Sequence, residues 1–384
     1  MPNKIRCLLI APLANGEGFS GEDAYTQSLL NYPPEGVEYI FHDDLVASGQ
    51  GWRVPWVHRL FPWLGERRLH ILPYTWVQSL GTNERFDLIH IHGWAVYLTG
   101  GLKDSQTPIV ISASSAPTYG LKAYKGWSDW RVRRYTILMR FLQKKLRIYD
   151  SYFSPGPARR IVVWSKWARN DYIRAGIEKS RLCVVPPGLP APELIPRVNK
   201  DQVRLLFVGN DFVRKGGFFL LEVFGNLRAR FGKKISLTIV SNYNEHVDMP
   251  AGVSWLRGIS HSTMGKLYQE HDIFVLPTLA EGYGISVLEA MSYGLPVIVS
   301  GVGALPEIVV DEKTGFVVQR GDNRQLEGRI ASLVKSQNLM FQMGDQARKR
   351  FEKFFSIEAR NEALRQLYYA TANCRDGYNA APKT

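Results

Sequence analysis

Short apolar runs of strand length alternate with longer segments of helical pattern throughout the first half of this chain. The runs are Arg6 to Ala11, Val37 to Phe41, Leu88 to His92, Ile109 to Ser112, Ile161 to Trp164 and Cys183 to Val185. Strands separated by helices are typical of a parallel α/β sheet, because a parallel connection must cross over the sheet. The first half is therefore predicted to form one such sheet.

A proline-rich segment interrupts this pattern near the middle of the chain. Five prolines fall between Pro186 and Pro196, and this density excludes a helix or a central strand. The alternation resumes after it with the runs RLLFVGN, ISLTIVS, DIFVLPT, PVIVS and TGFVV. The segment is therefore predicted to be a linker between two domains, which also suits a chain of 384 residues.

We predict an α/β protein with two Rossmann-like doubly wound domains that face each other across a cleft. Residues 1–188 form the N-terminal domain and residues 189–356 the C-terminal domain. A last helix, 357–372, follows Ser356, a residue type favoured at the N-cap, and is expected to pack back on the N-terminal domain. Residues 373–384 are expected to be a tail.

Cysteine content and apolar runs bear on the cellular setting. Cys7, Cys183 and Cys374 show neither the spacing of a zinc site nor the even number of a disulfide framework. We therefore expect a reducing, cytoplasmic setting. The apolar run after Arg6 is short and passes into a glycine-rich stretch, so it is interpreted as a strand and not as a secretion signal. No apolar run approaches the length that crosses a bilayer, so any membrane association should be peripheral.

The formal net charge of +13 predicts a polyanionic partner. Nucleic acid, an anionic membrane surface and phosphorylated substrates all meet that description. Charge by itself does not choose among them, so the choice must come from motifs.

The most informative stretch runs from Asp272 to Val309. A predicted strand ends at Pro277, Glu281 follows in a loop, and a predicted helix begins at Ile285. Gly282 and Gly284 open the backbone before that helix, where exposed amides and the helix dipole favour a phosphate. Glu289 lies one turn inside the helix, where a carboxylate can accept hydrogen bonds from ribose hydroxyls. Glu281 is then expected to face the group that is transferred.

A second motif, FVGNDFVRKGG from Phe207 to Gly217, suits the same ligand. A strand leads into a turn with Arg214 and Lys215, followed by two glycines at a helix start. Two cations beside such a terminus would stabilise a diphosphate leaving group as it gains negative charge. The alternative for both motifs is that these charged side chains are solvated loop and helix-surface residues, but their joint occurrence after predicted strands favours a site.

Together these stretches resemble the signature of the retaining glycosyltransferases of family 4, which adopt the two-Rossmann GT-B fold. The resemblance covers most of the second half of the chain. It implies that Glu281 lies near the donor sugar, that Glu289 binds the nucleotide ribose, and that Lys215 binds phosphate. The resemblance further implies that the amides of Tyr283, Gly284 and Ile285 hold the diphosphate and that Arg257 and Gly258 lie near the nucleobase. Gly209, Asn210 and Gly282 are further candidate donor-binding residues.

Two positions depart from the family pattern. The family usually has an arginine right after the first glycine of the second motif, where this chain has Asn210; Arg214 is a candidate substitute. Many relatives also have a donor-contacting histidine after the strand that here is Ile109 to Ser112. This chain has only serines and alanines there, which leaves open whether the catalytic set is complete.

The acceptor side offers weaker signals. Gly16, Gly18 and Gly21 follow the first strand, in the position of the family's glycine-rich acceptor-side loop, although an ordinary tight turn explains them equally well. His90 and His92 alternate at the end of a strand, so one of them is a candidate to contact substrate hydroxyls. The alternative is a strand-end histidine that serves the core.

Residues 122–149 are the best candidate for a partner surface. The stretch has nine basic residues and one acid, Asp129, and an apolar stripe at helical spacing: Tyr135, Leu138, Met139, Leu142, Leu146 and Tyr149. Such a helix suits anionic lipid head groups. The alternative is that the stripe packs into the core and the cations are only solvated.

We predict transfer of a hexosyl group from a nucleoside diphosphate sugar to a hydroxyl acceptor with retention, in cell-surface glycan or glycolipid synthesis. No Asp-x-Asp pair lies between two strands, so no metal and no other cofactor is expected. The acceptor could be lipid-linked, and no nucleic-acid partner is expected. The alternatives are a basic membrane- or nucleic-acid-binding protein on a degenerate scaffold, and a sugar-nucleotide epimerase or hydrolase.

Overall fold

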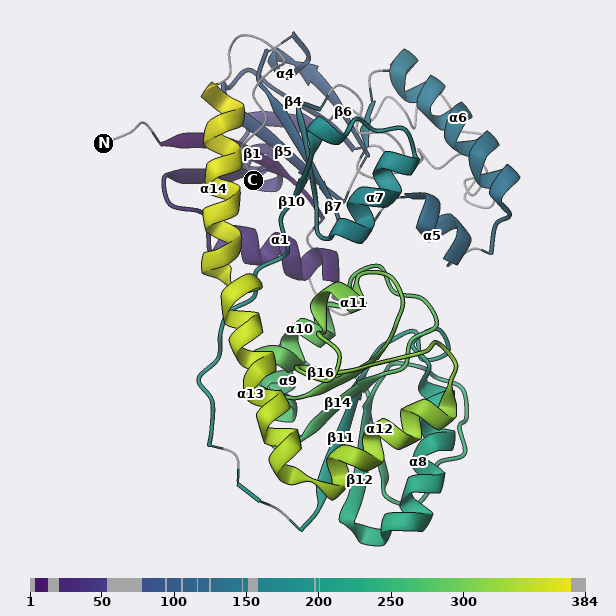
Figure 1. Cartoon of the computed structure of the whole chain (residues 1–384). Coiled ribbons are helices and arrows are strands. Elements are labelled where there is room, and N and C mark those ends of the chain that lie inside the picture. Colours follow the sequence, from purple (N-terminus) through teal and green to yellow (C-terminus); the bar gives the residue numbers. More distant parts are fainter. Residues whose placement is uncertain are drawn as a thin grey trace. The chain divides into compact units, whose positions relative to one another are not determined.

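The computed structural model describes residues 4–12, 21–53, 78–93, 95–104, 106–115, 117–123, 126–146, 148–150, 158–196, 198–199 and 201–373 (Figure 1). The chain divides into two compact units. Unit 1 is Met1–Pro186 together with Arg360–Thr384, and unit 2 is Pro187–Ala359. The glycine-rich loop with Gly16 and Gly18, and all of the expected tail after 373, lie outside the described residues.

The main sheet of unit 1 is parallel throughout and has the order β10-β9-β7-β5-β1-β2. Its strands are β1 (Ile5–Ile10), β2 (Val37–Phe41), β5 (Leu88–His92), β7 (Ile109–Ala113), β9 (Arg160–Val163) and β10 (Leu182–Val184). All six lie where the apolar runs predict strands. Every residue of β5 and β7 is buried, as expected for central parallel strands that are covered on both faces.

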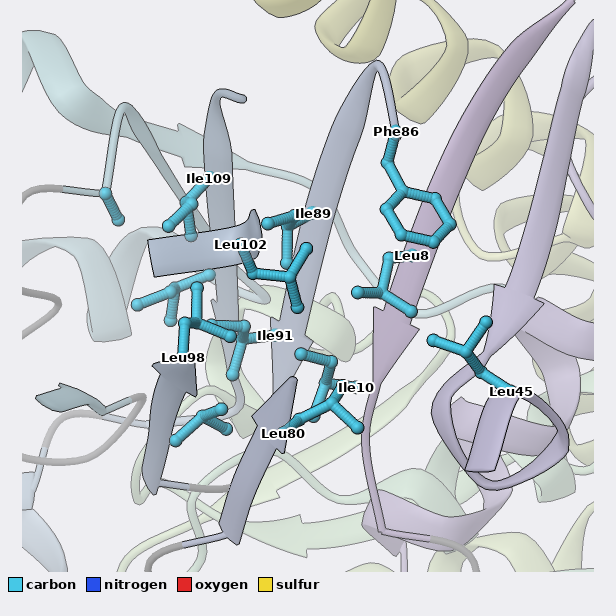
Figure 2. Close-up of a cluster of buried hydrophobic side chains, with 13 residues drawn as sticks. Leu8, Ile10, Leu45, Leu80, Phe86, Ile89, Ile91, Leu98, Leu102 and Ile109 are labelled. Atoms are coloured by element: carbon cyan, nitrogen blue, oxygen red, sulfur yellow. The ribbon is translucent and has the colours of Figure 1, made fainter. Parts of the chain in front are cut away.

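A smaller sheet covers part of one face of this main sheet. It has the order β3-β4-β6-β8, with the strands β3 (Gly51–Arg53), β4 (Gln78–Thr82), β6 (Ala95–Gly100) and β8 (Ile148–Asp150). Leu80 of β4 and Leu98 of β6 pack in one core cluster with Leu8, Ile10 and Ile91 of the main sheet (Figure 2). The sequence analysis did not predict this sheet, because its strands are short and β3 and β4 carry few apolar residues.

The helices of unit 1 are α1 (Gly21–Asn31), α2 (His42–Ala47), α4 (Gly101–Asp104), α5 (Pro117–Ala123), α6 (Asp129–Leu146) and α7 (Lys166–Arg174). α7 begins with Ser165 as its N-cap, and the Ser165 hydroxyl accepts a hydrogen bond from the amide of Ala168. Ala168 and Tyr172 of α7 pack on Ile161 and Val163 of β9. No helix in the described ranges has the length and apolar character needed to cross a bilayer.

Unit 2 has a parallel sheet of its own, in the order β13-β12-β11-β14-β15-β16. The strands are β11 (Val203–Val208), β12 (Ile235–Val240), β13 (Val253–Leu256), β14 (Ile273–Leu276), β15 (Val297–Ser300) and β16 (Gly315–Val318), and the helices are α8 (Gly217–Phe231), α9 (His261–Glu270), α10 (Ile285–Ser292), α11 (Leu305–Ile308), α12 (Asn323–Lys335) and α13 (Gln337–Phe354). The prediction of two doubly wound parallel sheets is confirmed. Among the strands of unit 2, the sequence analysis did not predict the edge strand β13, since none of its residues is fully buried and it has no apolar run.

The last helix, α14 (Ile357–Asn373), returns to unit 1 after α13. Arg360 is almost fully buried. Its guanidinium donates to the Ser28 hydroxyl of α1 at 2.6 Å and to the Tyr32 carbonyl at 2.7 Å. About two turns further along α14, the Tyr368 hydroxyl contacts the Tyr39 hydroxyl of β2 at 2.9 Å. These hydrogen bonds hold α14 against α1 and β2.

Candidate functional site

The two motifs of unit 2 come together at the carboxyl edge of its sheet. β11 and β14 are neighbours and run parallel, so the turn after β11 and the loop after β14 leave the same edge. Lys215 of the turn forms an ion pair with Glu281 of the loop, although 66 residues separate them. Both side chains are largely buried. A buried ion pair of this kind holds its two partners in one geometry, because breaking it would leave a charge without a counterpart.

Arg214 ties the same two segments together. Its Nε donates to Asp211 at 2.7 Å, and its Nη1 donates to the carbonyl of Ala280 at 2.6 Å. The carbonyl of Arg214 accepts the amide of Leu279 at 2.8 Å. Nη1 lies 4.0 Å from the Glu281 carboxylate. Arg214 therefore adds positive charge beside Lys215 and also shapes the loop that carries Glu281.

Glycines allow the close approach of these segments. Gly216 has φ +80° and caps α8, and a Cβ there would collide with the carbonyl oxygen of Pro277. The stem of Lys215 lies against Gly209, where a Cβ would stand 2.9 Å from the lysine Cγ. Gly284 has φ +101° and caps α10. Only glycine adopts such backbone angles without strain.

A third loop reaches the same place from β15. Gly303 has φ +58°, and a Cβ there would collide with the carbonyl oxygen of Glu281. The backbone of Glu281 is thus pressed against the loop after β15. Gly303 was not among the predicted site residues, although the motif around it was, because its contact with Glu281 depends on how β14 and β15 pair.

The helix α10 begins at Ile285, four residues after Glu281, and exposes backbone amides there. Gly282, Tyr283, Gly284 and Ile285 lead into its first turn, and the first amides of a helix have no partner in an earlier turn. The Tyr283 ring is buried, and this burial, with the charge of Glu307, raises its pKa well above the usual value. Tyr283 therefore offers its backbone, and not its hydroxyl, to a ligand at this terminus.

Glu289 lies on α10 and is partly exposed. Its Oε2 accepts a hydrogen bond from the Tyr268 hydroxyl at 2.8 Å. Burial, reinforced by the negative charge of Glu289, raises the pKa of Tyr268 well above its usual value, so the hydroxyl stays a donor. Tyr268 in turn stacks on Tyr293, with 5.4 Å between ring centroids. Tyr268 was not predicted, since nothing in its local sequence marks it.

Arg257 and Gly258 follow β13, two strands away from β11 at the same sheet edge. Arg257 donates to the carbonyl of Tyr243 at 3.3 Å, and its guanidinium lies 5.2 Å from the centre of the Trp255 ring. The amide of Gly258 donates to the side chain of Asn242 at 3.0 Å. Asn210 is exposed at the start of the turn after β11. These residues line the sheet edge, but none of the contacts above joins them to Glu281.

Unit 1 has a separate polar cluster at the carboxyl ends of β5 and β7. His92 is fully buried, and its Nε2 lies 2.5 Å from a carboxylate oxygen of Glu22 in α1. Its Nδ1 contacts the hydroxyl of Ser112 at 2.8 Å, and Ser114 donates to Glu22 at 2.7 Å. Burial opposes ionisation of Glu22, but the charge and hydrogen bond of His92 outweigh it and lower the pKa of Glu22. Glu22 was not predicted, because it follows a glycine loop without a motif of its own.

His90 is fully buried in unit 1 and forms hydrogen bonds inside its core. Its two ring nitrogens contact the hydroxyls of Tyr368 at 2.6 Å and Ser112 at 2.8 Å. Burial, together with the nearby charge of His92, lowers the pKa of His90 to about 3. The ring is therefore neutral at physiological pH and joins α14 to the main sheet.

This depressed pKa predicts a loss of stability in acid. In the unfolded chain His90 binds a proton below its ordinary pKa of about 6.5, whereas in the folded protein it does so only near pH 3. Unfolding therefore becomes more favourable as the pH falls through that window. Between pH 7 and pH 5 this group should cost about 2 kcal/mol of unfolding free energy. Urea unfolding at both pH values should show that His90→Gln loses less stability than the wild type on acidification. Equal losses in both proteins would contradict the assignment.

Comparisons with known proteins agree with this architecture. The model of the glycosyl transferases group 1 matches residues 195–350, and the model of glycosyltransferase family 4 matches residues 36–191. A capsular polysaccharide biosynthesis glycosyltransferase, CapM of Staphylococcus aureus, is 35% identical over 101 residues, which is 26% of this chain and 27% of CapM. The sulfoquinovosyl transferase of Arabidopsis thaliana is 26% identical over 310 residues, or 74% of this chain and 57% of the relative.

A solved structure shows the same fold. HepE of Anabaena in complex with UDP-glucose has a TM-score of 0.63 and 12% identity, over 95% of this chain and 100% of HepE. The chain spans between about a quarter and somewhat over half of the length of the two curated relatives above. The two family models adjoin near the proline-rich segment and together match most of the chain. Residues 36–191 therefore belong to glycosyltransferase family 4 and residues 195–350 to the glycosyl transferases group 1, and the chain has the GT-B fold.

Proposed function

We propose that this protein is a glycosyltransferase that transfers a hexosyl group from a nucleoside diphosphate sugar to a hydroxyl acceptor, in the synthesis of a cell-surface glycan or glycolipid. The observation that carries the proposal is the junction of Lys215, Arg214 and Glu281 at the sheet edge of unit 2. There, two cations stand beside the N-termini of α8 and α10. Helix termini and cations together favour a diphosphate.

Each side chain would have a distinct role. Lys215 and Arg214 would stabilise the diphosphate as it takes up negative charge on departure, and Glu281 would orient the transferred sugar. Glu289, oriented by Tyr268, would accept hydrogen bonds from the ribose hydroxyls. Gly209, Asn210 and Gly282 would border the phosphates, with Arg257 and Gly258 near the nucleobase. The structure of HepE in complex with UDP-glucose supports this class of donor.

The proposed reaction retains the configuration of the sugar and needs no metal. In a retaining transfer without a protein base, the departing phosphate oxygens help to deprotonate the incoming hydroxyl on the same face of the sugar. The site suits this because positive charge is supplied by Lys215, Arg214 and helix amides. The ion pair of Lys215 with Glu281 holds these two side chains of opposite charge in one geometry.

On unit 1, we propose that the acceptor hydroxyl binds near the His92–Glu22 pair at the carboxyl ends of β5 and β7. The Ser112 hydroxyl is within hydrogen-bond distance of both His90 and His92, and the Ser114 hydroxyl donates to Glu22. These serines therefore build the cluster that stands where many relatives have a histidine. We further propose a cytoplasmic protein that works on a lipid-linked acceptor at a membrane surface.

Product analysis tests this reaction. The full chain is incubated with UDP-, GDP- and ADP-hexoses, with and without a hydroxyl-bearing lipid-linked acceptor, and the products are followed by NMR. We expect a glycoside that forms only when the acceptor is present and that keeps the anomeric configuration of the donor. Release of free sugar without acceptor would indicate a hydrolase, a changed donor stereocentre an epimerase, and an inverted linkage would contradict retention.

A further inference from the structure

The helix α6 exposes four large apolar side chains. Trp130 and Phe141 are each 63% exposed, Ile137 is 60% exposed and Leu138 is 49% exposed. Exposed apolar residues are common one at a time, but several on one helix mark a contact surface. Figure 1 shows α6 as a long helix at the outer margin of unit 1.

These side chains share one face of the helix. Residues at positions 130, 134, 137, 138 and 141 follow the spacing that places side chains on one side of an α-helix. Val132, Thr136 and Met139 lie on the opposite side and are buried. α6 is thus held to its unit by one face and presents the other. The sequence-based stripe that combined Leu138 with Met139 is therefore corrected, because these two neighbours point in different directions.

Cations surround the exposed face. Arg131, Arg133 and Arg134 are all exposed. The Arg131 guanidinium lies 4.2 Å from the ring centre of Trp127, and that of Arg134 lies 5.7 Å from the ring centre of Trp130. The single acid between residues 122 and 149, Asp129, forms an ion pair with Lys122. Apolar groups in the middle and arginines along the sides match the chemistry of an anionic lipid surface.

Other occupants suit this face less well. A second copy of the chain would bring the same arginines toward each other, and like charges in contact are costly. Nucleic acid would pair with the arginines but would leave Ile137 and Leu138 without apolar partners. A bilayer meets both needs at once, because its acyl region buries the apolar side chains and its anionic head groups meet the guanidinium groups.

We infer that the exposed face of α6, formed by Trp130, Arg133, Arg134, Ile137, Leu138 and Phe141, docks the protein on an anionic lipid bilayer. The apolar side chains enter the boundary between head groups and acyl chains, and the arginines bind lipid phosphates. This inference deepens the proposed action on a lipid-linked acceptor. It rests on that proposal for its purpose, but its evidence comes from α6 alone.

Vesicle flotation with the full chain tests this inference without any sugar nucleotide. Vesicles of phosphatidylcholine with phosphatidylglycerol are compared with vesicles of phosphatidylcholine alone. We expect the wild type to float with the anionic vesicles, and the double variant Ile137→Ser/Phe141→Ser to lose at least about tenfold in binding, since it no longer buries these two apolar side chains in the bilayer. Arg133→Gln/Arg134→Gln should lower the preference for anionic over neutral vesicles.

Ile195→Ser provides the matched control, because Ile195 is 66% exposed but lies in unit 2, outside this face. It should float like the wild type. Circular dichroism should show that each variant is folded. Wild type that stays in the soluble fraction, or an Ile137→Ser/Phe141→Ser variant that floats like the wild type, would overturn the inference. So would a dimer that this variant dissociates while vesicle binding is unchanged. None of these results would affect the donor-site proposal, which nucleotide binding tests separately.

Discussion

Replacing Lys215 with alanine is expected to lower the rate of sugar transfer by a factor of about 100 to 1000, the usual cost of removing one group that stabilises charge in a transition state. The ammonium group of Lys215 is the counter-charge of the buried Glu281 carboxylate and, in the proposed reaction, of the leaving diphosphate. Its loss would leave only one of the two cations, the Arg214 guanidinium, which lies 4.0 Å from the Glu281 carboxylate.

Initial rates at saturating donor and acceptor measure this effect. Because the charge on the diphosphate grows as the glycosidic bond breaks, kcat should fall more than KM rises. Lys313→Ala is the control, since Lys313 is an exposed lysine of the same unit that lies just before β16 and outside the loops of the site. It should leave the rate within about twofold, as surface substitutions usually do. A Lys215→Ala enzyme as fast as Lys313→Ala would remove Lys215 from the reaction.

The second large effect is expected from Gly303→Ala. The added Cβ would meet the Glu281 carbonyl oxygen, and φ +58° is unfavourable for alanine. The strained backbone and the steric conflict together should cost about 2–4 kcal/mol of unfolding free energy. Relief of the conflict would displace Glu281 and its ion pair with Lys215. Thermal unfolding and nucleotide titration of the variant measure the two consequences.

Gly321→Ala separates these two causes. Gly321 has φ +77°, but nothing lies within 4 Å of a Cβ built there. This control should pay only the cost of the backbone angle, about 1–2 kcal/mol, and should bind nucleotide like the wild type. Equal losses of stability in the two variants, with nucleotide affinity intact in both, would show that the loop after β15 does not support Glu281.

The sequence predicts the two main sheets well because their strands are continuous apolar runs. Val37–Phe41 and Leu88–His92 match β2 and β5 residue by residue. The small sheet of unit 1 escaped prediction since segments such as Gln78–Thr82 carry little apolar character, and they become strands only through tertiary pairing. The same limit applies to α6, where helical periodicity groups residues on faces but does not determine which face the neighbouring elements cover.

The candidate site was predicted motif by motif, and its contacts were not. Local patterns place Lys215 after one strand and Glu281 after another, but their ion pair requires β11 and β14 to be neighbours, which only the strand order decides. Tyr268 reaches Glu289 from a different helix, so no spacing in the sequence links them. Glu22 likewise meets His92 across the fold. Side chains that act from a distant element leave no local signal.

Calorimetric titration of UDP, GDP and ADP into the full chain is the most direct test of the donor site. We expect at least one of these nucleotides to bind with a one-to-one stoichiometry. Glu289→Gln should weaken that nucleotide by about 10- to 100-fold, since a hydrogen bond to a charged group contributes about 1.5–3 kcal/mol. If all three nucleotides fail to bind, or if the Glu289→Gln/Lys215→Ala variant binds as tightly as the wild type, then unit 2 does not hold a nucleoside diphosphate in the way described.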